Sequence, residues 1–354
     1  MERFIAVDNV CAWPKLTLMK DGNLLLDVHN RPSHGSPDGS AECWRSEDDG
    51  RTWSFQGVSG VGSIENGPFI DKACGMAHNG DYLVIVENRL ETDSYIFRSK
   101  DGGKTFAEVG RVRCDGAQTI PYGAIIRIGE STLAVNYWIC CDKSKLTNPD
   151  AVRESHILIS RDDGASWTED YVISQGINET AILFYDEMEG IAIGRADEYP
   201  DNPSSGFSKG NLKFRTLDGG KTWKPEGQIM GHEMVPPHLT MLADGQTLLS
   251  VGFRFANLGG VMVSLSPDKG KSWGDPNILV DYPCVDGGYP SSVQMPDGTI
   301  VTAYYCSGCE YHTRYFAGVI RWRPQELLEA RWIGRPASCY YGSDKEFLNE
   351  WRMP

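Results

Sequence analysis

The sequence contains no run of about 18 apolar residues, the length that a helix needs to cross a bilayer. It also lacks a positive charge excess: 34 Lys and Arg stand against 48 Asp and Glu, so the formal net charge is −14. Nucleic acids and anionic membranes bind basic surfaces, so neither is expected as a main partner. The opening MERFIAVDNVCAWPK has no basic segment followed by a long apolar one, which predicts no signal peptide and a cytoplasmic location.

The cysteine pattern offers neither a disulfide framework nor a metal cluster. The ten cysteines are irregularly spaced, apart from the adjacent Cys140 and Cys141 and the pair Cys306 and Cys309. Without an export signal, free thiols in a reducing compartment are the simplest interpretation. A zinc site at Cys306 and Cys309 would need two further ligands, and no second cysteine pair has that spacing. We therefore expect neither a metal nor a cofactor.

What the sequence does contain is a turn repeated five times. The pattern Ser/Thr-x-Asp-x-Gly-x-x-Trp/Phe recurs with 50 to 61 residues between its aspartates, which are Asp48, Asp101, Asp162, Asp218 and Asp268. Repeats of roughly 40–50 residues or slightly more are typical of propellers and arrays. In each box the Asp can accept backbone N–H bonds, the Gly allows a positive φ and the aromatic ring packs beneath. One octapeptide in five places indicates a structural role rather than five active sites.

Around these boxes, an apolar run, a turn and a second apolar run recur six times, as in LTLMKDGNLLLDV and SSVQMPDGTIVTAYY. Alternating β-rich runs joined by Asp-Gly or similar turns are typical of β-hairpins. Six hairpins with five boxes predict an all-β fold: a single domain over residues 1–354, built as a six-bladed β-propeller of four-stranded antiparallel blades with Asp-box turns. The last blade lacks a box, so its outer strand is expected from ERFIAVDN at the N-terminus. The C-terminal stretch DKEFLNEWRMP is expected to form a short helix or tail.

The open ends of the hairpins are expected to meet over the central channel, where propellers tend to bind ligands. The residues just before the first strands are Lys15, Tyr122, Glu179, His238 and Tyr289. Those just after the second strands are Arg31, Arg89, Trp138, Arg195 and Arg254. Several guanidinium groups in one place favour an anionic ligand, although each arginine could instead pair with an acidic residue of a neighbouring blade.

These residues and boxes resemble the sialidase superfamily of exo-glycosidases. Sialidases carry a Glu ahead of a hairpin and an Arg soon after it, and Glu179 in INETAILF and Arg195 in AIGRADE are similar, sixteen residues apart. Their nucleophilic Tyr precedes a hairpin, as Tyr289 does in GGYPSSVQMPDG. A further Arg precedes a box in the blade before that Tyr, as Arg254 does.

The first blade is similar to that of sialidases in one respect and different in another. The acid/base Asp of sialidases lies in a loop shortly after an Arg, and NRPSHGSPDGSAE supplies Arg31 and Asp38. Sialidases begin with an Arg-Ile-Pro element, whereas CAWPKL places Ala12 at the position of that Arg. Lys15 or Arg31 could substitute for it, so the resemblance implies an acidic sugar, either sialic acid or a related ulosonate or uronate.

The resemblance implies an exo-acting retaining glycoside hydrolase in which Tyr289 is the nucleophile and Glu179 the base that takes its proton. A neutral phenol suits an anomeric carbon that bears a carboxylate, because that carboxylate repels an anionic nucleophile. The phenol pKa of about 10 makes the base necessary. Asp38 would protonate the leaving oxygen and would need a raised pKa to do so, with His34 in the same loop as its rival.

The remaining open-end residues are assigned to substrate binding. Arg89 would join the other arginines, His238 would line the subsite, and Tyr122 and Trp138 would form an apolar wall for the sugar. Two alternatives stay open: a polysaccharide lyase that acts on uronates through Tyr289, His238 or His34, and a non-catalytic propeller that binds acidic carbohydrate. In every case the expected partner is an acidic oligosaccharide or glycoconjugate.

Overall fold

The computed structural model describes residues 1–33, 36, 38–60, 69–88, 90–140, 153–197, 208–231, 233–255, 258–283, 286–310 and 312–329. Within these residues the chain forms 24 β-strands and one short helix, α1 (Pro324–Glu329). The expectation of an all-β fold is therefore confirmed. No helix of the described residues has the length and apolar character needed to cross a membrane.

The strands form six antiparallel groups of four, which we call units 1 to 6. Unit 1 consists of β2 (Cys11–Leu18), β3 (Leu24–His29), β4 (Ala41–Ser46) and β5 (Ser54–Gly60). Unit 2 consists of β6 (Phe69–Met76), β7 (Tyr82–Asn88), β8 (Ser94–Ser99) and β9 (Ala107–Val112). Unit 3 consists of β10 (Gln118–Ile128), β11 (Thr132–Cys140), β12 (Arg153–Ser160) and β13 (Glu169–Gln175). Unit 4 consists of β14 (Ile177–Phe184), β15 (Gly190–Asp197), β16 (Ser208–Thr216) and β17 (Lys224–Met230). Unit 5 consists of β18 (Met234–Met241), β19 (Thr247–Phe255), β20 (Leu258–Ser266) and β21 (Asn277–Tyr282). Unit 6 consists of β22 (Gly287–Gln294), β23 (Ile300–Cys306), β24 (Phe316–Trp322) and β1 (Glu2–Asp8).

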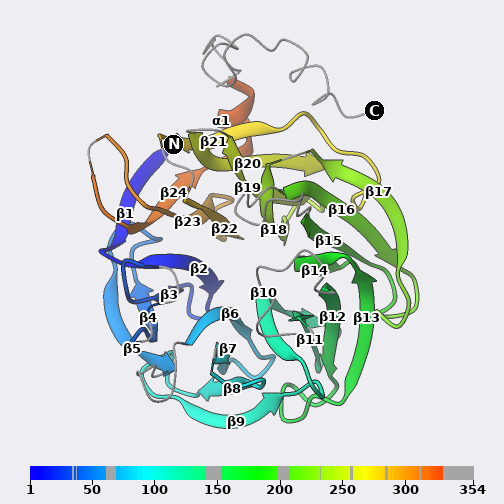
Figure 1. Cartoon of the computed structure of the whole chain (residues 1–354). Coiled ribbons are helices and arrows are strands. Elements are labelled where there is room, and N and C mark those ends of the chain that lie inside the picture. Colours follow the sequence, from blue (N-terminus) through cyan, green and yellow to red (C-terminus); the bar gives the residue numbers. More distant parts are fainter. Residues whose placement is uncertain are drawn as a thin grey trace, which may run out of the picture.

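The units are arranged around a centre, with their first strands innermost (Figure 1). In each unit the first and second strands pair as an antiparallel hairpin, so the six predicted hairpins are confirmed. Each first strand contacts the first strand of the next unit, and β22 contacts β2. Units 2 and 3 are further joined into one eight-stranded sheet by a short parallel pairing of β10 with β6. The open ends of the hairpins consequently surround one central region.

The hydrophobic core is divided among the interfaces between units. Six large clusters of buried apolar side chains each combine residues of two adjacent units, for example Leu26 and Val28 of unit 1 with Val301 and Val319 of unit 6. Each unit therefore buries one apolar face against each neighbour.

The five boxes connect the third and fourth strands of units 1 to 5 and stabilise the fold, as predicted. In unit 1 the Asp48 carboxylate accepts bonds from the backbone N–H of Thr52 at 2.8 Å and from its hydroxyl at 2.7 Å. The same two bonds occur in the other four boxes. The box glycine packs on the preceding unit: at Gly103, with φ +88°, a Cβ would lie only 2.7 Å from the Cys43 sulfur. A larger residue would push adjacent units apart.

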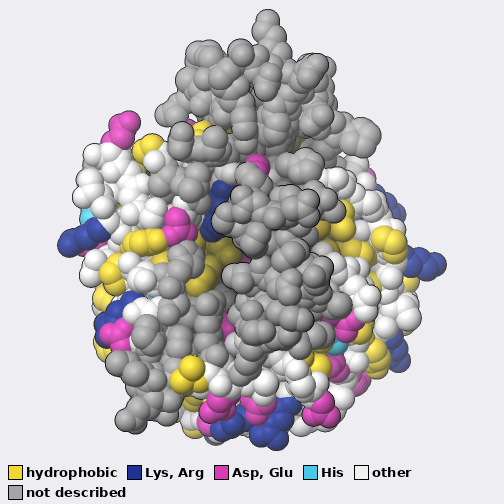
Figure 2. Space-filling view, in the orientation of Figure 1, with side chains coloured by type: hydrophobic (Ala, Val, Ile, Leu, Met, Phe, Trp, Pro, Cys, Tyr) yellow, Lys and Arg dark blue, Asp and Glu magenta, His cyan; other side chains and the backbone are white. Residues whose placement is uncertain are grey.

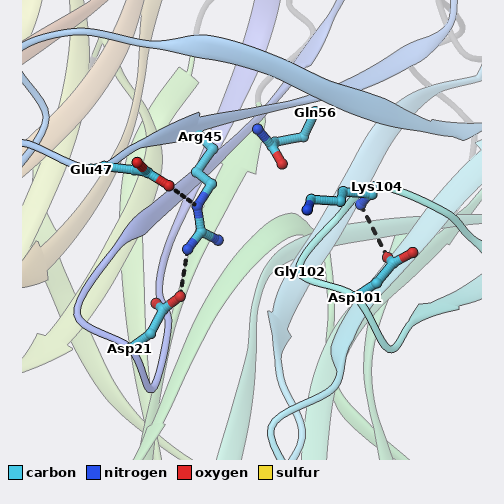
Figure 3. A pocket seen from close by; sticks show the side chains of 7 residues that line it. All are labelled: Asp21, Arg45, Glu47, Gln56, Asp101, Gly102 and Lys104. Carbon is cyan, nitrogen blue, oxygen red and sulfur yellow. Dashed lines mark hydrogen bonds and ion pairs between the residues drawn. The ribbon is translucent and has the colours of Figure 1, made fainter.

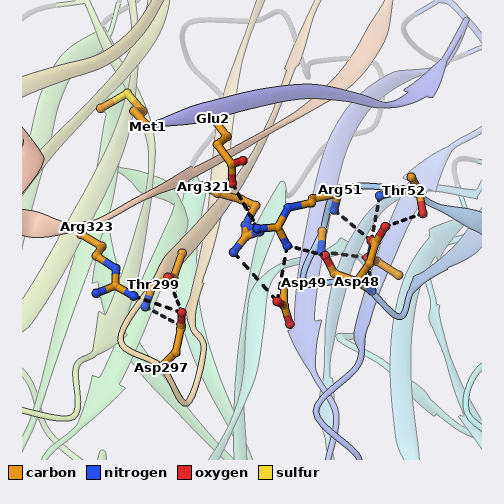
Figure 4. Close-up of polar contacts among 12 residues, drawn as sticks. Met1, Glu2, Asp48, Asp49, Arg51, Thr52, Asp297, Thr299, Arg321 and Arg323 are labelled. Carbon is orange, nitrogen blue, oxygen red and sulfur yellow. Dashed lines mark hydrogen bonds and ion pairs between the residues drawn. The ribbon is translucent and has the colours of Figure 1, made fainter.

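The N-terminal strand completes unit 6, as the missing sixth box suggested. β1 pairs antiparallel with β24, from Glu2 opposite Arg321 to Asp8 opposite Phe316. The Arg321 guanidinium lies 3.5 Å from Glu2 and 4.0 Å from Asp49 in the box of unit 1 (Figure 4). The first strand and the last strand of the described residues are therefore joined by backbone pairing, and Arg321 adds charge contacts to Glu2 and to Asp49 of unit 1.

The C-terminal helix or tail expected over DKEFLNEWRMP lies outside the described residues. The helix that is described, α1, was not predicted. Its sequence signals are Pro324 at the first helical position and Glu326, whose carboxylate accepts the Arg323 backbone N–H at 2.7 Å. Proline and a capping carboxylate are typical of a helix start.

Candidate active site

Tyr289 and Glu179 lie together at the open ends of units 6 and 4, as the sequence predicted. The Tyr289 hydroxyl donates a 2.6 Å hydrogen bond to Glu179 Oε1, and both side chains are buried. Arg195 donates a 2.9 Å hydrogen bond to the other carboxylate oxygen, Oε2. The phenol is thus in position to transfer a proton to Oε1 of a carboxylate whose other oxygen is bound by an arginine. The contact is confirmed, while the catalytic roles of these residues stay a prediction.

Irregular backbone turns these side chains toward the centre. Both strands have a register shift near their start, between Ile177 and Thr180 in β14 and between Gly288 and Ser291 in β22. Such bulges re-aim side chains and are common next to active sites. Tyr289 itself has φ 53°, in the left-handed region that costs a bulky residue about 1–3 kcal/mol. The rest of the strand holds the tyrosine in this strained conformation.

Aromatic rings enclose the Tyr289 ring on several sides. Trp13, Tyr305 and Tyr122 lie with ring centroids at 5.8, 5.7 and 6.5 Å from it. Trp13 was not predicted as a site residue, although its place next to a proline in CAWPKL, at the start of β2, was a usable signal. The enclosure keeps the phenol and its carboxylate partner in a medium of low polarity, where their hydrogen bond is stronger than in water.

The Arg254 guanidinium lies beside this ring and is anchored to the protein. Its Nε and Nη2 donate to the Gly287 carbonyl at 3.3 and 3.1 Å, and Nη2 also donates to the Tyr305 hydroxyl at 3.1 Å. Its Cζ is 5.6 Å from the centroid of the Tyr289 ring. Asp286 is the nearest carboxylate described, 4.0 Å from Nη2.

Glu233 is a carboxyl group of this region that the sequence analysis missed. It directly precedes β18, and its backbone carbonyl accepts the N–H of Arg254 at 3.0 Å. Burial raises its pKa to about 7, although the positive charges of Arg195 and Arg254 act against the rise. Like Tyr289 it has a positive φ, 66°. The available signal was its position five residues before His238, at the same open end of unit 5.

Asp38 differs from the acid that the sequence predicted. Its carboxylate is about half exposed, accepts a bond from Arg31 Nε at 2.9 Å and accepts another from the Ser36 hydroxyl at 2.6 Å. The Ser36 bond, assisted by Arg31, lowers the pKa of Asp38. A general acid needs the opposite shift, and the described surroundings of Asp38 do not supply it.

The expected convergence of uncompensated arginines is also wrong in part. Arg195 and Arg254 lie at the Tyr289–Glu179 pair. The side chain of Arg31 is about two-fifths exposed and forms an ion pair with Asp38. Arg31, Arg195 and Arg254 each have an acidic neighbour within 4.0 Å, so the structure favours the alternative in which each arginine is paired. Arg89 and His34 lie outside the described residues.

Lys15, Tyr122 and His238 form a buried group rather than an exposed lining. The Lys15 ammonium is 4.1 Å from the Tyr122 ring centroid, and the Tyr122 hydroxyl donates to the Pro237 carbonyl at 2.9 Å. Burial, assisted by the charge of Lys15, lowers the pKa of His238 to about 3. The neutral ring accepts the Ser292 backbone N–H at Nδ1, 3.3 Å away. His238 is therefore a poor base, which weakens the role given to it in the lyase alternative.

Trp138 is buried in a small cluster with Ile120 and Cys140 at the open end of unit 3. Its indole Nε1 is buried and has no hydrogen-bond partner among the described residues. The predicted sugar-stacking role of Trp138 stays a prediction. Within the described ranges, no three His, Cys, Asp or Glu side chains are grouped so as to hold a metal ion.

A separate hollow of about 340 Å³ lies between units 1 and 2, on the side of the hairpin turns and boxes (Figure 3). It is lined by Asp21, Arg45, Glu47, Gln56, Asp101, Gly102 and Lys104. Arg45 is paired with Asp21 and, at 3.2 Å, with Glu47, so its charge is already compensated. Acidic and basic side chains also adjoin one another along the lower rim in Figure 2. The hollow has neither an aromatic ring for a sugar nor a charge of one sign for an ion.

Comparison with solved structures shows the same fold in several proteins. A Dyadobacter fermentans protein of unknown function is 19% identical, with a TM-score of 0.73, over 91% of this chain and 98% of its own. A Hadza microbial sialidase is 16% identical, with a TM-score of 0.67, over 92% of this chain and 66% of its own. The α-L-arabinofuranosidase of Fusarium graminearum is 14% identical, with a TM-score of 0.65, over 93% and 99%.

Comparison of sequences gives a family but no close relative. No curated protein is similar to this chain in sequence. The model of the BNR repeat-like domain matches residues 82–302, which is more than half of the chain and includes the boxes of units 2 to 5. With the sialidase and the arabinofuranosidase among its structural neighbours, the resemblance to a sialidase-like superfamily is confirmed. The chain belongs to the BNR repeat-like domain family.

Proposed function

We propose that this protein is an exo-acting retaining glycoside hydrolase with a tyrosine nucleophile. The observation that carries the proposal is the 2.6 Å hydrogen bond from the Tyr289 hydroxyl to Glu179, a carboxylate that Arg195 also binds. A phenol needs an adjacent base to become a nucleophile, and Glu179 is within reach of its proton. The glycosidases among the structural neighbours are consistent with this class of reaction.

In the first step, Tyr289 Oη bonds to the anomeric carbon while its proton passes to Glu179. The bond between the anomeric carbon and the leaving oxygen breaks, and an acid delivers a proton to that oxygen. In the second step, water attacks the anomeric carbon from the side of the departed group, and the acid, now a carboxylate, takes the proton of that water. The bond between Tyr289 Oη and the anomeric carbon breaks, and Glu179 returns its proton to the phenolate. Two inversions give net retention.

We propose Glu233 as the acid in preference to Asp38. A carboxyl group with a pKa of about 7 is protonated in about half of the molecules at neutral pH, whereas the lowered pKa of Asp38 leaves that group ionised. Glu233 also interacts electrostatically with both Arg195 and Arg254. Arg195 binds Glu179, and Arg254 lies beside the Tyr289 ring. Catalytic acids are commonly tuned in this way by burial.

For the substrate we propose a glycan whose terminal sugar is acidic, bound through Arg195 and Arg254. Guanidinium groups bind carboxylates with charge-assisted bonds. A specific observation favours a second candidate, a neutral sugar: Arg195 is paired with Glu179 at 2.9 Å and Arg254 has Asp286 at 4.0 Å. Paired arginines attract a further anion less strongly than free ones. One of the structural neighbours, the α-L-arabinofuranosidase, carries the name of an enzyme for a neutral sugar.

The proposal takes units 1 to 6 as the six blades of a propeller. The ring of contacts between first strands and the six apolar interfaces between units support this count. The central end of such a propeller would be the substrate site, with Tyr289 and Glu179 contributed by blades 6 and 4.

The test is a panel of chromogenic glycosides that includes α-sialosides, uronides and α-L-arabinofuranosides. Product stereochemistry is followed by proton NMR, and a fluorinated glycosyl fluoride of the best substrate is used to trap the intermediate for mass spectrometry. We expect retention and an adduct on Tyr289. Inversion, an adduct on another residue, or an unsaturated uronate product with its absorbance would each exclude the proposed mechanism.

A further inference from the structure

The residues that hold Arg254 form a network that none of the roles above includes. Asp286, at the end of the segment before β22, accepts the Tyr305 hydroxyl at Oδ1, 2.7 Å away, and the Tyr315 hydroxyl at Oδ2. The rings of Tyr305 and Tyr315 are stacked, with an interplanar angle of 13°. Each oxygen of this carboxylate is therefore occupied by a phenol, and its charge faces Arg254 at 4.0 Å.

Tyr305 connects the carboxylate to the guanidinium. Its hydroxyl donates to Asp286 and accepts from Arg254 Nη2 at 3.1 Å. Burial raises the pKa of Tyr305, so the hydroxyl keeps the proton that it donates. The side chain is fully buried and its backbone carbonyl accepts the Tyr282 hydroxyl at 3.2 Å, which fixes the ring in place.

The second anchor of Arg254 is the backbone next to the nucleophile. Both Nε and Nη2 donate to the carbonyl of Gly287, two residues before Tyr289. The guanidinium is thereby tied to the strand that carries Tyr289, with its Cζ 5.6 Å from the centroid of that ring. A cation near an aromatic ring is attracted to it, and the attraction grows when the phenol becomes a phenolate.

We propose that Tyr305 and Asp286 are positioning residues, which hold the Arg254 charge against Tyr289 so that it stabilises the phenolate formed during attack. The inference rests on the proposed function, in which Tyr289 is the nucleophile. In this arrangement Arg254 activates the nucleophile from one side while Glu179 receives its proton on the other. The acidic neighbour of Arg254 then serves to fix its position rather than to cancel its effect on Tyr289.

The experiment measures the titration of Tyr289 directly, without requiring turnover. The full-length protein is labelled with 3-fluorotyrosine, and the ¹⁹F resonance of residue 289 is identified by its loss in Tyr289→Phe. The titration midpoint of that resonance is then compared in wild type, Arg254→Lys, Tyr305→Phe and Asp286→Asn. Tyr304→Phe is the matched control, because Tyr304 is the adjacent residue of β23 and packs into the apolar cluster between units 5 and 6.

We expect Tyr305→Phe, which releases Arg254 from Tyr305 and removes no charge, to raise the midpoint by roughly one pH unit, since an opposite charge at this range shifts a pKa by about 1–3 units. Asp286→Asn should raise it less, because loss of the carboxylate charge by itself favours the phenolate. Tyr304→Phe should leave it unchanged. If Tyr305→Phe and Asp286→Asn prevent folding, Tyr315→Phe removes one anchor of Asp286 from a half-buried position and should shift the midpoint in the same direction. A wild-type midpoint in folded Tyr305→Phe and Asp286→Asn, or in folded Tyr315→Phe where those two do not fold, would overturn the proposal. The absence of turnover on every glycoside would overturn the proposed function and leave this titration as a separate result.

Discussion

The hydroxyl of Tyr289 donates a 2.6 Å hydrogen bond to Glu179, a residue 110 positions earlier in the chain. Two units of the fold, far apart in sequence, meet at this bond. Since the bond joins a potential nucleophile to a potential base, substitutions at its two ends give the most direct tests of function.

Replacing the nucleophile should abolish turnover without unfolding the protein. We expect Tyr289→Phe to lower kcat by roughly 10³-fold or more, because the ring remains for packing while the reacting oxygen is lost. Thermal unfolding should stay close to that of wild type, and Tyr304→Phe serves as the control for removal of a neighbouring hydroxyl. Turnover near the wild-type rate in Tyr289→Phe would show that another group attacks the sugar.

The acid can be identified from the leaving group and the pH. Glu233 must be protonated to act, and its pKa is about 7, so kcat/KM for a poor leaving group should fall as the pH rises through 7. Glu233→Gln should lower that rate by about 10²–10⁴-fold and should spare an activated aryl glycoside, which needs no proton.

Asp38→Asn is the comparison variant for this assignment. Because Asp38 is exposed and paired with Arg31, its substitution should change neither the rate nor the pH profile substantially. The reverse pattern, with Asp38→Asn losing the poor leaving group and Glu233→Gln keeping it, would restore the assignment made from the sequence.

The charge of the substrate can be tested by binding in the Tyr289→Phe background, where turnover does not interfere. For an acidic sugar, Arg195→Ala or Arg254→Ala should weaken binding by about tenfold or more, since tenfold corresponds to ~1.4 kcal/mol and a charge-assisted bond contributes about 1.5–3 kcal/mol. The methyl ester of the same sugar should lose little. Arg31→Ala, at an exposed pair, is the control. Equal losses for the acid and its ester would favour a neutral substrate.

The boxes should make the protein sensitive to acid. Hydrogen bonds within each turn hold the pKa of the five box aspartates at about 2, whereas an unfolded aspartate titrates at about 3.9. A lowered pKa in the folded state contributes stability above pH 4, and that contribution is lost as the pH falls toward 2. Thermal midpoints measured across this range should therefore fall for wild type. Asp218→Asn should start lower and fall less steeply, while Asp275→Asn, an exposed aspartate outside the five boxes, should behave as wild type.

The sequence by itself determined the repeating parts of this protein. The boxes, the six hairpins and the closing strand β1 were predicted because turn chemistry and alternation of apolar residues act over a few neighbouring positions. The pairing of Tyr289 with Glu179 was also predicted, because both were expected at the open ends of first strands and the resemblance to sialidases gave each a role.

Only the tertiary structure decided the electrostatics of the site. Whether a carboxyl group has a raised or lowered pKa depends on its burial and on charges brought from other units, which is why Glu233 was missed and Asp38 was chosen. The same holds for Arg254, whose partner Asp286 comes from the next unit. A sequence pattern reports which residues are available at the open ends of the hairpins. Their protonation and their free charge are fixed by contacts that exist only once the units have packed against one another.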